Sequence, residues 1–378
     1  MKKVLVSAII ISMLYSSAII SSYAEEIPLT EEETTEQTVN QTTYMNIDDA
    51  INYALEHKCS IKSAEAAILV NKYSKGAALK NYNNLNKVKD GSTFQSVLAL
   101  KGFELETATL KYDNSVRELE VLKKDCKNNV KTNFYTYFSS VEKLDIAKTN
   151  LDNAKEKLGF AKTRLDTGII SRLDYESFEL AVMKAENAYT QAQRNVNQCL
   201  ENIKYAIDFP VNEELVITGS MPEINVDFVS ADEAVKLSKS LTNYITLEKN
   251  FELAQKRWEY AENYYFPSEH SYYIEKYTYE QAKADYASNV NALEQNIKSA
   301  YNNLLNQRDN LNYTEKEIEH AKKLTDVAYT KYEMGLMTAS DYIETEQNYF
   351  TSTNGYLDAK LAYRTAALTY KATYTTTE

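Results

Sequence analysis

The sequence predicts an all-α protein made of two tandem repeats, each a long antiparallel coiled-coil hairpin of helices. Glycine and proline are scarce, with 8 Gly and 4 Pro in 378 residues, and such a composition favours long helices. Apolar residues recur about every 3.5 residues along one arm, which is the spacing of a coiled-coil seam. A turn motif that begins with glycine occurs twice, and similar arms flank both copies.

Residues 1–24 have the features of a secretory signal peptide. Lys2 and Lys3 precede a largely apolar run from Val4 to Ile20, and a small-residue cleavage site ends at Ala24. A retained membrane anchor is the alternative, but the run is short of a full membrane span. We therefore expect cleavage, and export across the cytoplasmic membrane. Residues 25–44 are rich in Glu, Thr and Gln, and they are predicted to form a disordered acidic spacer.

The first helical repeat is assigned to residues 45–209. A helix is predicted from Asn46 to about Tyr82, followed by an irregular patch over residues 83–103. The next arm has an apolar seam at steps of three or four residues, which predicts a left-handed coiled-coil helix about 90 Å long. The seam residues are Leu105, Ala108, Tyr112, Val116, Leu119, Leu122, Cys126, Val130, Phe134, Tyr137, Val141, Leu144, Ala147, Leu151, Ala154, Leu158, Ala161 and Leu165. An Ala-rich return arm then leads to a connector over residues 210–229.

The second helical repeat is assigned to residues 230–374. Its start, Ser-Ala-Asp-Glu-Ala from Ser230, resembles the Asn-Ile-Asp-Asp-Ala start from Asn46. The last arm has a tyrosine at every seventh position from Tyr342 to Tyr370. A ladder that stacks a ligand is one interpretation of these rings, but a helix seam with hydroxyls at its edge is the more common use.

Each repeat has a glycine turn between its two long arms. The Gly can take the left-handed conformation that ends a helix, and a hydroxyl three residues later can cap the next helix. An acidic residue three positions further on favours a capping box. The residues concerned are Gly168, Ser171 and Asp174 in the first turn, and Gly335, Thr338 and Asp341 in the second.

No pattern in the sequence indicates an enzyme, a cofactor or a metal site. A glycine-rich phosphate loop, a nucleophile elbow and paired zinc-binding Cys are missing. The three Cys are odd in number and are interpreted as small core residues, and the three His lie far apart. A cluster of Tyr between Tyr260 and Tyr286 could stack on glycans, although helix packing is the commoner role. The net charge of −12 argues against a nucleic-acid partner.

The duplicated order of these features resembles the TolC family of outer membrane efflux proteins. The resemblance covers Asn46 to about Tyr374 and rests on the helix starts, the long arms and the two turns. It implies a homotrimer whose long helices form a tunnel. It also implies that the turns lie at the tunnel mouth, where a periplasmic-adaptor-type protein of an export pump docks. By position, the docking residues would be Gly168, Ser171, Asp174, Gly335, Thr338 and Asp341.

The sequence departs from this family where the family's members insert pairs of membrane β-strands. A pair of membrane strands with its turn needs at least about 20 residues. Residues 83–90 have too few apolar positions for a lipid-facing strand, and the corresponding segment of the second repeat, Pro267 to Ile274, offers only eight residues. We therefore expect β-barrel strands to be missing or vestigial, so that membrane contact through the usual barrel is not expected.

Two functions are consistent with these features. The first is a TolC-like conduit component of an efflux or secretion system, which is non-enzymatic and docks an adaptor. The second is a structural coiled-coil protein of the cell envelope without transport activity. For a relative without a barrel, a cell-wall or secreted location is expected in place of the outer membrane.

Overall fold

The computed structural model describes residues 42–85, 93–223 and 227–375. The expected signal peptide lies outside the described residues, as does most of the expected spacer. The helices are α1 (Ile47–His57), α2 (Cys59–Leu85), α3 (Phe94–Leu100), α4 (Phe103–Asp166), α5 (Arg172–Ala206), α6 (Ala231–Ser238), α7 (Thr242–Glu262), α8 (His270–Glu333) and α9 (Ala339–Tyr374). Two short strands, β1 (Thr43–Met45) and β2 (Leu215–Ile217), complete the described elements. The all-α prediction is confirmed.

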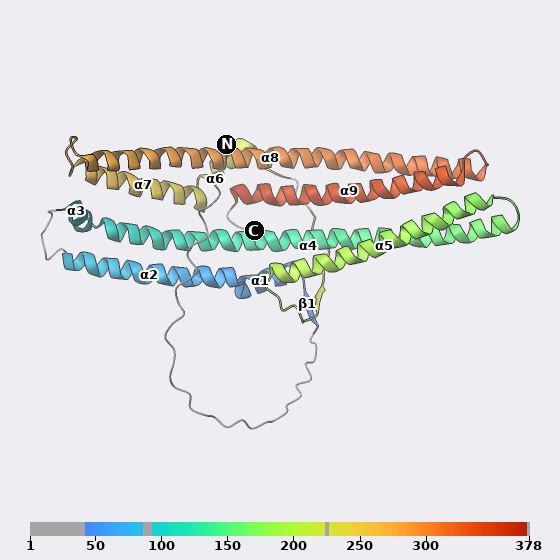
Figure 1. Cartoon of the computed structure of the whole chain (residues 1–378), viewed down its shortest axis with the longest axis horizontal. Coiled ribbons are helices and arrows are strands. Elements are labelled where there is room, and N and C mark those ends of the chain that lie inside the picture. The colour runs from blue at the N-terminus through green and yellow to red at the C-terminus, as the bar shows by residue number, and fades with distance from the viewer. Residues whose placement is uncertain (1–41, 86–92, 224–226, 376–378) are drawn as a thin grey trace, which may run out of the picture. The chain divides into compact units, whose positions relative to one another are not determined.

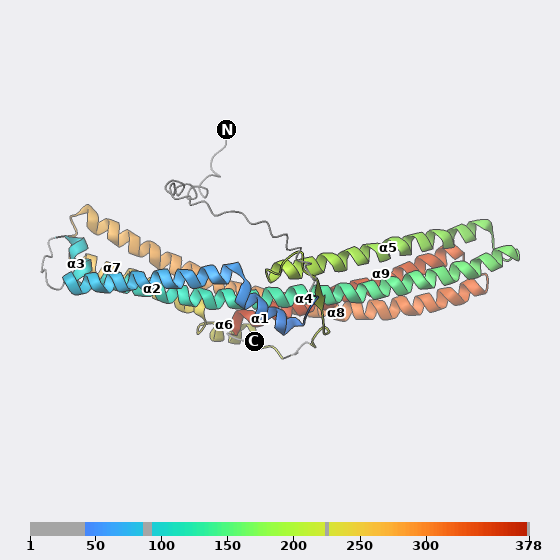
Figure 2. The same ribbon diagram turned by 90° about the horizontal axis from the view of Figure 1, so that it is seen from below.

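Two helices of 64 residues, α4 and α8, organise the unit that follows residue 40. At 1.5 Å per residue each is about 96 Å long. Helices α2 and α5 pack along different halves of α4, and α7 and α9 do the same along α8 (Figure 1). The repeats meet where α4 contacts α7 and α9 (Figures 1 and 2). In the half of the molecule that is remote from the glycine turns, the helices therefore lie side by side in the order α2, α4, α7, α8. Helices α2 and α8 are the outer two.

The predicted seam of α4 lines the interior of the first repeat except at Val141, which is 38% exposed and corrects the prediction at that position. Its residues Val130 and Phe134 are fully buried, and they share a core with Ile61, Ile203 and residues of the two strands. The tyrosine stripe of α9 is a seam as well, because Tyr342, Tyr363 and Tyr370 are all at least nine-tenths buried. Tyr370 donates a hydrogen bond to the carbonyl oxygen of Val229, at 2.9 Å. The stripe is therefore packing and not an open ladder.

The two strands join the start of the first repeat to the connector. They pair in parallel, with Thr43 opposite Leu215 and Met45 opposite Ile217. Thr43 and Tyr44 thus belong to a strand, although the sequence placed them in the disordered spacer. The reason is the burial of Met45 and Leu215 in the core of the first repeat, which outweighs the polar composition of the preceding residues.

The helix predicted from Asn46 to about Tyr82 is two helices, and this corrects the sequence-based prediction. Asn46 caps α1 with a full capping box, as its sequence suggested. Lys58 then takes an extended conformation, and its ammonium donates to the carbonyl oxygen of Ala206 at 2.6 Å. The backbone N–H of Cys59 donates to the Asp208 carboxylate at 2.9 Å, so a residue distant in sequence caps the start of α2. Cys126 and Cys199 are buried as expected, but Cys59 is exposed, which corrects its interpretation as a core residue. Cys59 begins α2 directly after the kink, on the solvent side of the helix.

Helix and turn occupy the described residues where the family resemblance implied pairs of strands. Within the patch predicted to be irregular, α3 forms because Thr93 caps it and Phe94 and Leu98 are buried. They pack with Phe103 and Ala261, which joins the two repeats at this end. Between α7 and α8 there is only a short turn, as the eight-residue segment required. No described helix combines the length and the apolar character needed to cross a membrane.

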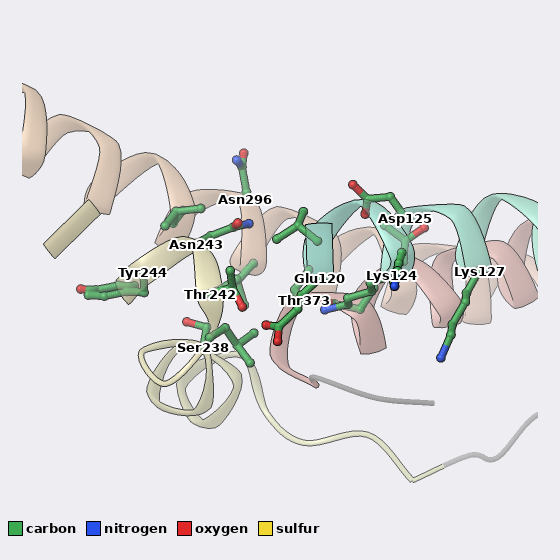
Figure 3. A pocket seen from close by; sticks show the side chains of 17 residues that line it. Glu120, Lys124, Asp125, Lys127, Ser238, Thr242, Asn243, Tyr244, Asn296 and Thr373 are labelled. Carbon is green, nitrogen blue, oxygen red and sulfur yellow. Dashed lines mark hydrogen bonds between the residues drawn. The ribbon is translucent and has the colours of Figure 1, made fainter. Parts of the chain in front are cut away.

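A cavity of about 660 Å³ lies between the repeats, near their middle. Figure 3 shows its walls, which come from α4, the junction of α6 and α7, α8 and the end of α9. Lys124 on α4 donates to the carbonyl oxygens of Ala372 and Thr375, at 2.5 and 2.6 Å. It thereby caps the carboxyl end of α9. Burial lowers the pKa of Lys124.

Asp208 provides a test of how the kink at Lys58 is held. Among the described residues, Asp208 is the non-glycine residue with a positive φ, which is 55°. Its carboxylate caps α2. We expect Asp208→Ala to lower the free energy of unfolding by about 2 kcal/mol, since it removes a cap and keeps a strained φ. Asp208→Asn should change it little, because Asn tolerates this φ and retains an oxygen acceptor. Urea unfolding followed by circular dichroism measures both, and equal losses in the two variants would contradict the capping role.

Candidate functional site

The first turn joins α4 to α5 through a helix end and a capping box. The backbone N–H of Gly168 donates to Leu165 and that of Ile169 to Arg164, which closes the last turn of α4. Gly168 has a φ of 75°. The Ser171 hydroxyl accepts from the backbone N–H of Asp174 at 3.1 Å, and the Asp174 carboxylate accepts from the N–H of Ser171 at 3.2 Å. The predicted cap is present in full.

The second turn joins α8 to α9 with the same backbone path. Gly335 has a φ of 71°, and the N–H of Leu336 donates to the carbonyl oxygen of Lys331. The Thr338 hydroxyl accepts from the N–H of Asp341 at 3.1 Å. For this turn the described contacts include the hydroxyl cap but not the reciprocal carboxylate bond that completes the box in the first turn. Asp341 is accordingly the more exposed of the two carboxylates.

The structure brings the two turns together at one end of the repeats (Figure 1). The guanidinium of Arg164 on α4 donates to both carboxylate oxygens of Glu333 on α8, at 2.8 Å each. This hydrogen-bonded pair raises the pKa of Arg164. Beneath it, Ala161, Phe178 and Ala339 form a small buried cluster with residues of both hairpins. We call the two turns together with their capping residues, residues 167–174 and 334–341, the paired turns.

A second contact between the two hairpins joins α4 to α9 further along these helices from the turns. Lys157 on α4 forms an ion pair with Glu346 on α9, and its ammonium lies over the ring of Tyr342 at 5.3 Å. The Tyr342 hydroxyl donates to the same carboxylate at 2.6 Å. Burial and this bond raise the pKa of Tyr342 far above its ordinary value. The tyrosine is thus a neutral donor at all physiological pH values.

Large apolar side chains are exposed at the paired turns. Ile169 and Leu336 occupy equivalent positions after the two glycines, and they are 71% and 74% exposed. Leu173 and Met334, which also belong to the paired turns, are exposed to a similar degree. Four exposed apolar side chains thus lie at one end, on helices held together by an ion pair and a buried cluster. Exposed apolar side chains that gather in one region mark sites of protein contact more often than isolated ones do.

The tyrosine cluster that the sequence suggested takes part mainly in helix packing. Most rings between Tyr260 and Tyr286 pack on neighbouring helices, for example Tyr272 on Trp258 and Tyr286 on Phe251. Among the described residues, no group of three or more His, Cys, Asp or Glu could hold a metal ion.

The six residues singled out from the sequence lie in the paired turns, three in each. Sequence reasoning identified the turn chemistry, but it missed the pairs that hold the turns together. Arg164 and Glu333 are ordinary members of charged helix faces, and only the folded structure puts them opposite each other. The exposure of Ile169 and Leu336 was also missed, although both follow the turn glycines directly.

The glycines of the paired turns can be tested against a glycine within a helix. A Cβ added at Gly168 or Gly335 would meet no atom within 4 Å, so the positive φ is the constraint. Changing either residue to Ala should lower the free energy of unfolding by about 1 kcal/mol. Gly159 lies inside α4 and has equal space, so Gly159→Ala should raise it by up to about 1 kcal/mol. Urea unfolding of the three single variants measures these signs, and a stabilised Gly168→Ala would contradict the turn geometry.

Comparison with known proteins gives one match in sequence and several in structure. Residues 268–372 match the family model described as outer membrane efflux protein. A search of curated protein sequences gives no match. The fold is similar to that of the outer membrane protein VceC from Vibrio cholerae, with a TM-score of 0.69, 12% identity, and coverage of 87% of this chain and 95% of that chain.

Two further solved structures have the same fold at similar values. The Campylobacter jejuni CmeC outer membrane channel gives a TM-score of 0.67 at 12% identity, covering 87% of this chain and 85% of that chain. The open state of the Neisseria gonorrhoeae MtrE outer membrane channel gives a TM-score of 0.68 at 13% identity, covering 87% of this chain and 88% of that chain. Residues 268–372, which belong to the second repeat, therefore match the outer membrane efflux proteins in sequence. The chain has the fold of TolC-family channels over most of its length. The resemblance seen in the sequence is confirmed.

Proposed function

We propose that this chain is a non-enzymatic component of an export conduit. In this proposal three copies form a helical tunnel, and the paired turns dock an adaptor protein of an export pump. The observation that carries the proposal is the agreement of the fold with outer membrane channels over 87% of the chain. The family match over residues 268–372 supports it independently, because it comes from sequence.

The paired turns are the proposed docking site because they combine a fixed backbone with exposed apolar side chains. Gly168, Ser171 and Asp174 define the first turn, and Gly335, Thr338 and Asp341 define the second. The Arg164–Glu333 ion pair and the buried cluster around Phe178 hold the two turns at a set spacing. A preorganised surface loses less conformational entropy when a partner binds. Ile169 and Leu336 would supply the apolar contact.

The location proposed for the chain is the cell envelope. The proteins with the same fold are described as outer membrane proteins or channels. The expectation of a cell-wall or secreted location has no support in these comparisons. The alternative of a structural coiled-coil protein is likewise favoured by none of the observed features.

The apolar residues of the paired turns provide a direct test of docking. We expect the double variant Ile169→Asn, Leu336→Asn to keep its helicity and thermal melting, because both side chains are more than 70% exposed. It should lose export of the pump substrate and co-purification of the adaptor with the tagged chain. These are measured in cells that produce both proteins.

A matched control changes apolar side chains that are equally exposed elsewhere. Val211 in the connector and Phe266 between α7 and α8 are 75% and 72% exposed. The double variant Val211→Asn, Phe266→Asn should retain export and adaptor binding. Undiminished export by the folded turn variant, or equal loss in the control, would contradict docking at the paired turns.

The carboxylates of the paired turns can be tested in the same cells. The double variant Asp174→Ala, Asp341→Ala keeps the Ser171 and Thr338 hydroxyl caps and loses the Asp174 carboxylate bond to the Ser171 N–H together with two acidic charges at helix starts. This should cost about 1 kcal/mol in total without loss of helicity. If the carboxylates also contact the adaptor, export should fall well below that of the Asp208→Ala variant, which is expected to lose at least as much stability away from the paired turns. Normal export with a lowered melting temperature would restrict Asp174 and Asp341 to stabilising the starts of their helices.

A further inference from the structure

A second cavity, of about 550 Å³, lies between the two hairpins beside the paired turns. Its walls come from α4, α5, α8 and α9, so that both repeats contribute to it. Five of its ten lining residues are aromatic, and they are Phe160, Phe178, Tyr329, Tyr332 and Tyr342. A concave site lined mainly by rings, with few polar groups, is typical of a site for an apolar small molecule.

The bridge between Arg164 and Glu333 fixes the place of two of these rings. Phe160 precedes Arg164 by four residues on α4, and Tyr329 precedes Glu333 by four residues on α8. Residues four apart share one face of a helix, so both rings lie one turn below the bridge, on opposite walls of the cavity. Phe160 is 61% exposed and Tyr329 is 52% exposed. Their ring faces are therefore open to a ligand.

The other three rings form a preformed part of the wall. Phe178 is only 4% exposed, and it meets Tyr332 edge to face with ring centroids 6.0 Å apart. Tyr332 stacks on Tyr342 at 5.2 Å, with the two ring planes 10° apart. Rings that their neighbours already hold in place lose little conformational entropy when a ligand binds.

The charges of the cavity favour a ligand without net charge. Its two cations each have a carboxylate partner, because Arg164 pairs with Glu333 and Lys157 pairs with Glu346. A charged ligand would lose hydration without finding an unpaired opposite charge among these groups. Lys157 and Arg164 are seven residues apart, so the two bridges lie about 10 Å apart along α4. This spacing leaves room for a few fused aromatic rings.

We propose that this cavity binds a flat, uncharged aromatic molecule between Phe160 and Tyr329. The ligand stacks on these two rings and covers the buried edge of Phe178, and it leaves both ion pairs intact. Because the ligand touches both hairpins, its binding raises the melting temperature of the chain. The site requires neither the trimer nor the adaptor, so it goes beyond the proposed function and does not depend on it.

Two fluorescent probes with the same ring system test the site in the purified full chain. Phenylnaphthylamine is uncharged, whereas anilinonaphthalenesulfonate carries a sulfonate. Fluorescence titration should show one uncharged probe per chain, bound more tightly than the sulfonate. The double variant Phe160→Ala, Tyr329→Ala should keep its helicity, since both rings are exposed. It should bind the uncharged probe ~10-fold or more weakly, because two stacking contacts are lost.

A matched control removes one phenylalanine and one tyrosine elsewhere. Phe266 and Tyr277 are 72% and 64% exposed and lie outside the cavity. The double variant Phe266→Ala, Tyr277→Ala should bind the uncharged probe as the unchanged chain does. Equal loss in both variants, tighter binding of the sulfonate, or no binding of the uncharged probe would overturn the site. A lowered native mass of the Phe160→Ala, Tyr329→Ala variant would also overturn it, since a second copy would then fill the cavity.

Discussion

The regular apolar seam along α4 is the constraint on which the rest of the structure depends. A helix of 64 residues cannot be stabilised by its own hydrogen bonds and propensities alone. It persists because buried and half-buried seam residues recur along most of its length, so that α2 and α5 can pack along it. The packing along α4 is tightest at the centre of the first repeat, where Val130 and Phe134 are fully buried. The second repeat meets the same requirement with tyrosines on α9.

The apolar packing is concentrated within each repeat and at the two ends where the repeats meet. Clusters around Phe94 at one end and Phe178 at the other contain residues of both repeats. Between these ends, α4 and α9 are joined by ion pairs, such as Lys143 with Asp358 and Lys360 with Glu142. Exposed ion pairs contribute little stability, and so the paired turns owe their spacing mainly to the apolar cluster beside them.

The sequence was sufficient for the features that local chemistry controls. The caps at Asn46 and Ser171 and the glycine turns follow from interactions over three or four residues. The kink at Lys58 could not be predicted, because its cap comes from Asp208 at a separation of 149 residues. The strand at Thr43 and the pair of Arg164 with Glu333 also depend on tertiary contacts. At the candidate site, the turns were therefore predictable, but their exposed apolar side chains and their pairing were not.

We propose that copies of this chain assemble around a tunnel with the paired turns at its mouth. Electron microscopy of the purified protein, with single-particle averaging, tests this assembly directly. We expect a hollow particle with threefold symmetry, whose helical wall is about 96 Å long. A solid coiled-coil rod, or separate single chains without a central opening, would contradict it.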